Sequence, residues 1–154
     1  MKTINLFSQF VAEVKLSYRS KVKASDRLQI KSSKDASDIF MGSWDIGSLE
    51  HIEQFKLILL NRSNKVLGVA TISSGGISGT VTDVRVIFQY AIKANASGLI
   101  ICHNHPSLSL NPSESDTRIT QKIKEAGNIL DIQLLDHLII TAQDYFSFAD
   151  NGLL

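Results

Sequence analysis

The sequence is poor in several features that mark special classes of protein. Cys102 is the single cysteine in 154 residues, so no disulfide can form within the chain. No apolar run approaches the ~20 residues of a membrane-spanning helix, and the opening residues lack the apolar core of a signal peptide. Only two prolines are present, which argues against extensive disorder. We therefore expect a cytoplasmic protein that does not enter the membrane.

An excess of charge of one sign is also missing. The chain has 16 Lys and Arg against 15 Asp and Glu, a formal net charge of +1, which gives no global reason to expect nucleic acid as a partner. Residues 15–34 are the local exception, because they hold seven basic residues and one aspartate. Such a stretch is usually a solvated surface, although it could contact phosphate groups.

The length and composition indicate one folded domain. A chain of 154 residues with 44% hydrophobic and 20% charged residues can bury a substantial core but has no room for two domains of ordinary size. We divide it into an N-terminal extension, residues 1–30, and a domain, residues 31–154. Apolar residues at helical spacing from Ile4 to Leu16 predict an amphipathic helix, which could pack on its own domain or on a second copy in a homodimer.

Periodicity along the rest of the chain predicts alternating strands and helices. Residues 22–31 look like a strand around a turn, and Ser33 precedes a short helix that ends near Gly42. The main elements that we predict are strands at 54–61 and 65–73, a glycine-rich loop at 73–80, a helix from Asp83, a strand at 98–102, a helix at 114–130 and a strand at 132–141. In the helix at 114–130 we expect an apolar face made of Ile119, Ile123, Ala126 and Leu130. This order is typical of an α/β fold.

Two histidines follow the buried strand directly. In extended backbone, His103 and His105 lie on the same side and about 7 Å apart, so a slight curl lets both reach one ion. Asp116, just inside the next helix, is the natural third ligand, because zinc accepts His nitrogen and carboxylate oxygen and keeps a fourth position for water in catalytic sites. Ser113-x-x-Asp116 is also a helix capping box, in which Asp116 would simply accept backbone N–H bonds.

Together these residues resemble a known family. Glu53, the run His103-Asn104-His105-Pro106-Ser107, Ser113 and Asp116 match the JAMM motif of MPN (JAB) domains and look like the RadC group over roughly residues 30–154. The pairs Asn95-Ala96 and Asp136-His137 and the stretch Ser147-Phe148-Ala149 are also similar to that group. The resemblance implies a mixed β-sheet flanked by helices, in the three-layer, cytidine-deaminase-like architecture. It also implies one zinc ion on His103, His105 and Asp116.

The resemblance further implies roles for two other residues. Glu53 would be the general base, and Ser113 would donate a hydrogen bond to the oxyanion of the tetrahedral intermediate. Alternatively, Glu53 is an exposed charge that opens a strand, and nearby Glu50 leaves open which carboxylate faces inward. We expect Cys102 to pack in the core, His51 to be exposed, and His137 to serve either as a partner of a ligand or as a structural histidine.

One departure from the family pattern affects the loop after the histidines. Most RadC sequences have Gly where this chain has Leu108, which predicts the loss of left-handed backbone freedom at that position and a changed loop shape. The leading hypothesis is a zinc-dependent hydrolase of peptide or isopeptide bonds. The alternatives are a DNA-repair-associated accessory protein that binds nucleic acid, and a zinc-bearing interaction module without turnover.

Overall fold

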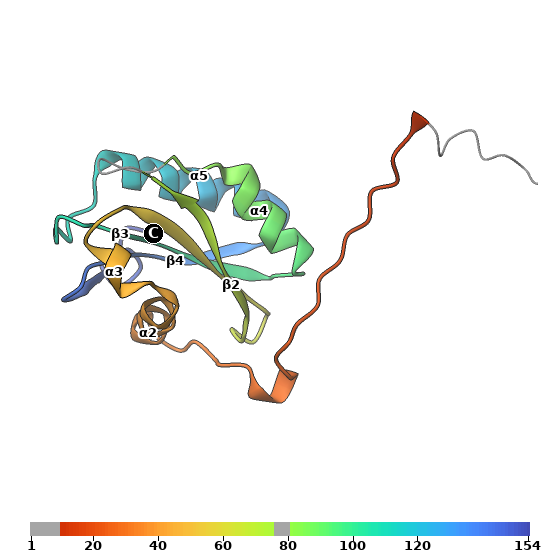
Figure 1. Cartoon of the computed structure of the whole chain (residues 1–154), viewed down its shortest axis with the longest axis horizontal. Helices are drawn as coiled ribbons and strands as arrows, with labels where there is room; N and C mark the ends of the chain where they lie inside the picture. The colour runs from red at the N-terminus through yellow and green to blue at the C-terminus, as the bar shows by residue number, and fades with distance from the viewer. Residues whose placement is uncertain (1–9, 76–80) are drawn as a thin grey trace, which may run out of the picture.

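The computed structural model describes residues 10–75 and 81–154 of the chain (Figure 1). It has the order of elements expected for an α/β domain. In chain order the elements are the 3-10 helix Ala24–Asp26, α2 (Ser33–Ser43), α3 (Ile46–Leu49), β1 (Gln54–Leu60), β2 (Val66–Ser74), α4 (Val84–Lys93), β3 (Gly98–Asn104), α5 (Glu114–Leu130), β4 (Gln133–Ile140) and β5 (Tyr145–Ser147).

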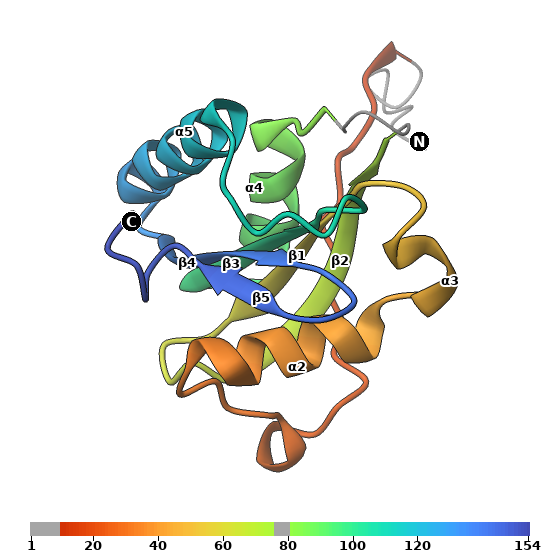
Figure 2. The ribbon, with the colours of Figure 1, turned by 90° about the vertical axis from the view of Figure 1, so that its left-hand side faces the viewer.

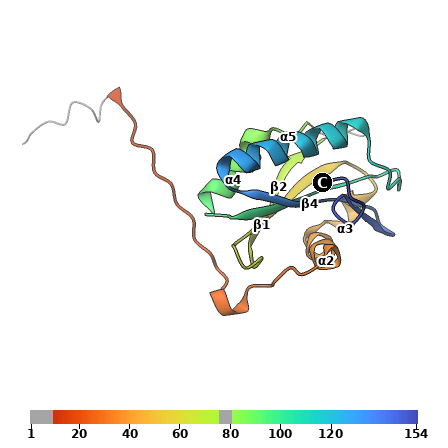
Figure 3. The same cartoon turned by 180° about the vertical axis from the view of Figure 1, so that it is seen from behind.

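The strands form one mixed sheet in the order β2-β1-β3-β4-β5. β3 and β4 run parallel, with α5 as the crossover between them, and the other neighbours are antiparallel. Figure 2 shows α4 and α5 over one face of the sheet and α2 over the other, and the view from behind in Figure 3 shows the same three layers. The predicted α/β class, with a mixed sheet between helices, is confirmed.

Alternation along the strands divides the core into two parts. In β1, Phe55, Leu57 and Leu59 pack with α4 and α5, whereas Ile58 and Leu60 pack with α2, because successive side chains of a strand point to opposite faces. Every residue of β3 is buried, as expected for a strand covered on both faces. β3 is the central strand of the sheet and leads into α5. The last residues of β3 and the start of α5 therefore lie close together, at the C-terminal end of the strand.

The predicted elements of the domain agree well with the observed ones. β1, β2, β3, β4, α4 and α5 lie where periodicity placed them, and α2 begins at Ser33 with Ser32 as its N-cap residue. β5 was missed, since its three residues are too few to produce a periodic pattern. The expected face of α5 was wrong at its end: Leu130 is 43% exposed, and the buried residues of the helix are Thr120, Ile123 and Gly127.

Gly127 explains how the end of α5 can lie so close to the backbone at Ile132, just before β4. A Cβ atom at this position would come within 2.3 Å of the Ile132 carbonyl oxygen. Only glycine therefore allows the last turns of α5 to approach the start of β4 so closely.

The N-terminal predictions need correction. Residues 11–20 form neither helix nor strand, and Phe10, Val11, Val14 and Leu16 are exposed; the first part of the expected helix, residues 4–9, lies outside the described residues. An amphipathic helix gains most of its stability from a partner surface, and residues 10–16 lead away from the sheet (Figure 1). Tyr18 is the part of this segment that reaches the sheet: its hydroxyl donates to the Leu67 carbonyl of β2 at 2.7 Å. Residues 22–31 contain a short 3-10 helix and a single bridge, Gln29 with Lys65, rather than a strand around a turn.

Among the helices of residues 10–75 and 81–154, none combines the length and the apolar character that a membrane crossing demands.

Candidate metal centre

The predicted ligands come together where β3 ends and α5 begins. His103 is the last but one residue of β3 and is almost completely buried on the α5 side of the sheet. Asp116 occupies the third position of α5, inside a capping box in which the Ser113 hydroxyl accepts the Asp116 N–H at 3.1 Å. Asp116 Oδ2 in turn accepts the Ser113 N–H at 2.7 Å. The capping box is therefore real.

Capping does not prevent Asp116 from facing the histidines. Its Oδ1 lies 3.1 Å from His103 Nε2, and its Oδ2 lies 3.5 Å from His105 Nε2. The two imidazole Nε2 atoms are 2.9 Å apart. The helix cap holds the carboxylate where it faces both imidazoles, so capping and a position suited to a ligand are compatible.

The three ligand atoms fit a single metal ion. All of them lie within 4.8 Å of one another. Ligands at ~2.0–2.1 Å around a tetrahedral ion are separated by about 3.3 Å. The imidazole nitrogens, 2.9 Å apart, and His103 Nε2 and Asp116 Oδ1, 3.1 Å apart, come close to this separation. Two imidazole nitrogens and a carboxylate that converge in a partly buried space need a positive charge among them, either a proton or a cation. This group of side chains could therefore bind a metal ion.

The electrostatics of the group agree with this description. Burial by itself raises the pKa of the Asp116 carboxyl, but the adjacent His103 and His105 rings outweigh burial and hold that pKa well below its usual range. The hydrogen bond to Asp116 raises the pKa of His105 against the opposing effect of burial. Asp116 is thus a carboxylate at neutral pH, and the start of α5 adds the favourable field of the helix dipole.

The loop after β3 orients His105. Its Nδ1 lies 2.6 Å from the Ser109 carbonyl oxygen, which can only accept, so Nδ1 carries a proton and Nε2 faces Asp116. Leu108 lies in this loop with φ of 67°, and its N–H donates to the His105 carbonyl at 3.0 Å. The expected loss of the left-handed conformation at this position is therefore wrong: leucine adopts it, at a conformational cost of about 1–2 kcal/mol.

Glu53 lies beside the ligands. It borders a cavity of 270 Å³ at the start of β1, together with His103 and Asp116. The other residues that line this cavity are Phe55, Val81, Thr82, Ser115 and Ile119. Ser115 lines it and Ser113 does not. The Ser113 N–H is committed to Asp116, so only its hydroxyl proton is available for another acceptor. The structure thus brings Glu53 to the predicted ligands and leaves Ser113 two positions before Ser115, the first residue of this segment that lines the cavity.

Asn104, between the two histidines, holds the segment that carries Glu53. Its side chain points to the opposite face and is fully buried. Its Oδ1 accepts the Gln54 N–H at 2.7 Å, and its Nδ2 donates to the carbonyls of Leu49 and Ile52 at 2.7 and 2.8 Å. The sequence analysis gave Asn104 no role, although alternation along an extended His-Asn-His run already points its side chain away from the ligands.

The other three residues considered in the sequence analysis are Cys102, His51 and His137. Burial raises the pKa of the Cys102 thiol well above its usual value, and the side chain packs in the α2 core, as predicted. His51 is exposed, also as predicted. His137 is fully buried, and its Nε2 lies 2.8 Å from His103 Nδ1. Burial lowers its pKa well below the usual value, so its ring is neutral.

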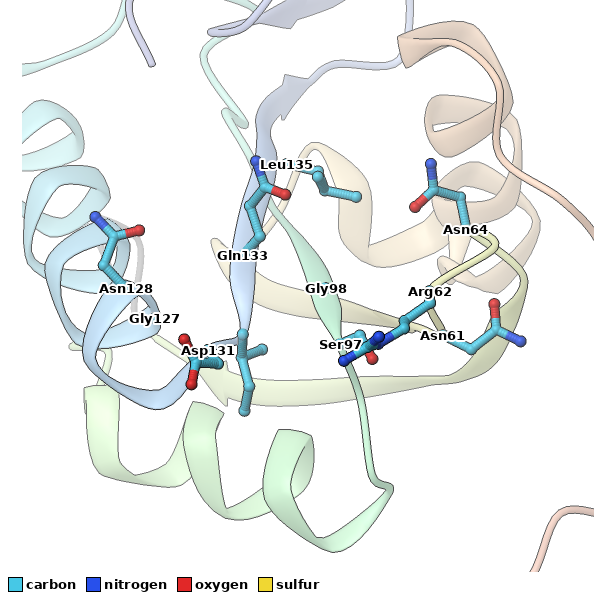
Figure 4. A pocket seen from close by; sticks show the side chains of 11 residues that line it. Asn61, Arg62, Asn64, Ser97, Gly98, Gly127, Asn128, Asp131, Gln133 and Leu135 are labelled. Atoms are coloured by element: carbon cyan, nitrogen blue, oxygen red, sulfur yellow. The ribbon is translucent and has the colours of Figure 1, made fainter.

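A larger cavity lies at the other end of β3. It measures 430 Å³ and is lined by residues of the β1–β2 turn, the starts of β3 and β4 and the end of α5 (Figure 4). Its walls carry the polar side chains of Asn61, Arg62, Asn64, Ser97, Asn128, Asp131 and Gln133. None of the predicted ligands lies there.

The fold and the His-His-Asp group define an α/β domain with a candidate metal site at the end of a central strand. A family model described as the RadC-like JAB domain matches residues 30–153, and the chain belongs to this family.

Several similar proteins share one name. A "UPF0758 protein" of Flavobacterium johnsoniae is 51% identical over 146 residues, which cover 93% of this chain and 62% of the relative. A "UPF0758 protein" of Clostridium beijerinckii is 38% identical over 94% of this chain and 62% of the relative. One of Porphyromonas gingivalis is 46% identical over 66% of this chain and 45% of the relative. The chain thus spans less than two thirds of the length of these relatives.

Proposed function

We propose that this protein is a zinc-dependent hydrolase of peptide or isopeptide bonds. One observation carries the proposal: two imidazole nitrogens and a carboxylate oxygen lie within 4.8 Å of one another, beside a cavity that Glu53 also lines. A metal-binding group with a neighbouring carboxylate is the minimum set for metal-assisted hydrolysis.

Zinc is the metal that suits these ligands best. His103, His105 and Asp116 provide two nitrogens and one oxygen, a set that zinc accepts in tetrahedral sites with one position left open. Zinc bound there would polarise a carbonyl group and make water a stronger nucleophile near neutral pH. Calcium and magnesium, which prefer oxygen ligands, suit this set less well.

Glu53 supports the hydrolytic step as a proton carrier. Its carboxylate would take a proton from the attacking water and pass it to the leaving amine. Asn104 holds the backbone on both sides of Glu53, through Ile52 and Gln54, so the carboxylate starts from a fixed position. Such positioning lowers the entropy that must be lost on reaching the transition state.

The first turn of α5 supports the stabilisation of negative charge. Ser113 would donate its hydroxyl proton to the oxyanion while its backbone N–H holds Asp116. The positive end of the α5 dipole lies at the same place and favours a developing anion.

The experiment that tests the proposal compares Glu53→Gln with Glu50→Gln. Both variants lose one negative charge from the same short segment, but Glu50 is exposed and does not line the cavity. We expect both to retain one zinc per chain by metal analysis. Hydrolysis of a fluorogenic library of peptides and lysine-linked isopeptides should fall about 10²–10⁴-fold in Glu53→Gln and stay unchanged in Glu50→Gln.

Two results would count against the proposal. Full activity of Glu53→Gln would remove that residue from the mechanism. A zinc-loaded wild-type chain that cleaves no member of the library would favour the non-catalytic, zinc-bearing module instead.

A further inference from the structure

A line of buried hydrogen bonds runs from α5 to the first predicted ligand. The Thr120 hydroxyl lies 2.6 Å from the Asp116 carbonyl oxygen and 2.6 Å from His137 Nδ1. His137 Nε2 lies 2.8 Å from His103 Nδ1. Thr120, His137 and His103 are each at most 3% exposed. Water therefore has little access to any of these contacts.

The chemistry of these groups gives the line one direction. A carbonyl oxygen only accepts, so the single hydroxyl proton of Thr120 is donated to Asp116. The Thr120 oxygen must then accept a proton from His137 Nδ1. An imidazole that carries its proton on Nδ1 presents an electron pair at Nε2, so His137 Nε2 accepts and His103 Nδ1 donates to it. The proton of His103 is thereby kept on Nδ1, and its Nε2 faces Asp116 with a free electron pair.

We infer that Thr120 and His137 are positioning residues, which fix the tautomer of His103 so that its Nε2 is available to a metal ion. The inference rests on the proposed zinc site, but it concerns how the ligand is prepared rather than which bond is cleaved. Metal-bound histidines commonly donate their second N–H to a neighbouring acceptor. Here that acceptor is a second, uncharged imidazole.

Packing holds the relay in place. The His137 ring stacks on Phe148 with centroids 4.6 Å apart and planes within 11°. The His103 ring lies parallel to Phe55, at 6.1 Å and 4°. Thr120 is one helical turn beyond Asp116 on the same face of α5, so the relay joins two ligands that are thirteen residues apart in the sequence. Rotation of either ring would break a contact at both of its ends.

The first test is direct observation of the tautomer of His137. Nitrogen-15 NMR of the zinc-free protein, under mildly alkaline conditions, reports which ring nitrogen carries the proton. We expect the proton on Nδ1 in the wild type and a mixture of both tautomers in Thr120→Val. A wild-type His137 protonated on Nε2 would reverse the two hydrogen bonds of its ring, to Thr120 and to His103, and overturn the inference.

The second test is zinc affinity, measured by competition with a chromophoric chelator. Thr120→Val keeps the shape of the side chain but loses the hydroxyl, and we expect zinc binding to weaken about 10–100-fold. Thr120→Ser restores the hydroxyl and should bind zinc nearly as the wild type does. Thr117→Val is the matched control: Thr117 makes the same bond to a carbonyl four residues earlier, that of Ser113, but is exposed and contacts no imidazole.

The outcomes separate this inference from the proposed function, because neither readout uses a substrate. Wild-type zinc affinity in a folded Thr120→Val would overturn the inference and leave the hydrolase proposal standing. Weakened zinc binding in Thr120→Val, together with a zinc-loaded wild type that cleaves nothing, would support the relay and contradict the hydrolase. Equal weakening in Thr117→Val would assign the effect to the helix and overturn the relay.

Discussion

The two ends of β3 both gather polar side chains, yet they differ in burial and in hydrogen bonding. At the end of β3 near the start of α5, the polar side chains are buried and bonded to one another or to backbone groups; they are His103, Asn104, Thr120 and His137. At the other end, the cavity is larger, 430 against 270 Å³, but Arg62, Asn64, Asn128 and Asp131 are exposed on its walls (Figure 4).

This difference indicates which end of β3 holds an organised functional site. A buried polar group costs free energy unless it is bonded, so several such groups pointing at one place form an organised set. Exposed polar groups around a hollow carry no such cost and need no organisation. The size of a cavity is therefore a poorer guide than the convergence of buried side chains.

The largest effect is expected when one negative charge is removed at either end of α5. Asp116 lies in its first turn and Asp131 caps its last turn. Asp116→Asn should reduce bound zinc from one per chain to nearly none, because the carboxylate is lost, whereas Asp131→Asn should retain it. Metal analysis after gel filtration measures both. Retention of zinc by Asp116→Asn would show that the two ends do not differ in this way.

A smaller effect is expected on the free energy of unfolding when an asparagine that bonds backbone groups is replaced at either end of β3. Asn104 bonds three backbone groups in a buried site, and Asn61 accepts two N–H groups in the half-exposed β1–β2 turn. Asn104→Ala should lower the free energy of unfolding by about 2–4 kcal/mol, since buried groups lose their partners. For Asn61→Ala we expect about 1 kcal/mol or less, since water replaces the lost bonds. Urea denaturation measures the difference, and equal losses would contradict it.

The smallest effect concerns backbone conformation. Leu108 and Asn64 both have positive φ, 67° and 56°, one near each end of the strand. Leu108→Gly should raise the free energy of unfolding by about 1 kcal/mol, because leucine tolerates this conformation poorly. Asn64→Gly should change it less, since asparagine adopts the left-handed region more readily. A destabilised Leu108→Gly, detected by its thermal midpoint, would mean that contacts of the leucine side chain outweigh the strain.

Much of the fold was predictable because its periodic segments are long. β1, β3 and β4 are strands of seven or eight residues that are rich in apolar side chains, and α4 shows a clear apolar face, so alternation and helical spacing located them. The expected helix at Ile4–Leu16 shows the limit of that method. Its spacing is amphipathic, but residues 11–16 form no helix, and the spacing of apolar residues does not tell whether a partner surface exists.

The convergence of two histidines and an aspartate was predictable for a different reason. His103 and His105 share one side of an extended run, and Asp116 opens the next helix, so local geometry and the parallel connection of β3 to β4 bring them together. Thr120 carried a weak signal, one turn after Asp116, and was missed because a threonine among apolar residues looks like an ordinary helix position.

Short-range spacing along the chain was enough to predict the order of β1 to β4, α4 and α5, the burial of β3 on both faces and the three side chains that converge. Only the tertiary structure decided that Thr120, His137 and His103 form one directed line of hydrogen bonds, that Asn104 fixes the segment of Glu53, and that leucine occupies a left-handed position. Those features depend on contacts between residues 17 to 55 positions apart and on a backbone angle imposed by its surroundings, and no local pattern in the chain records them.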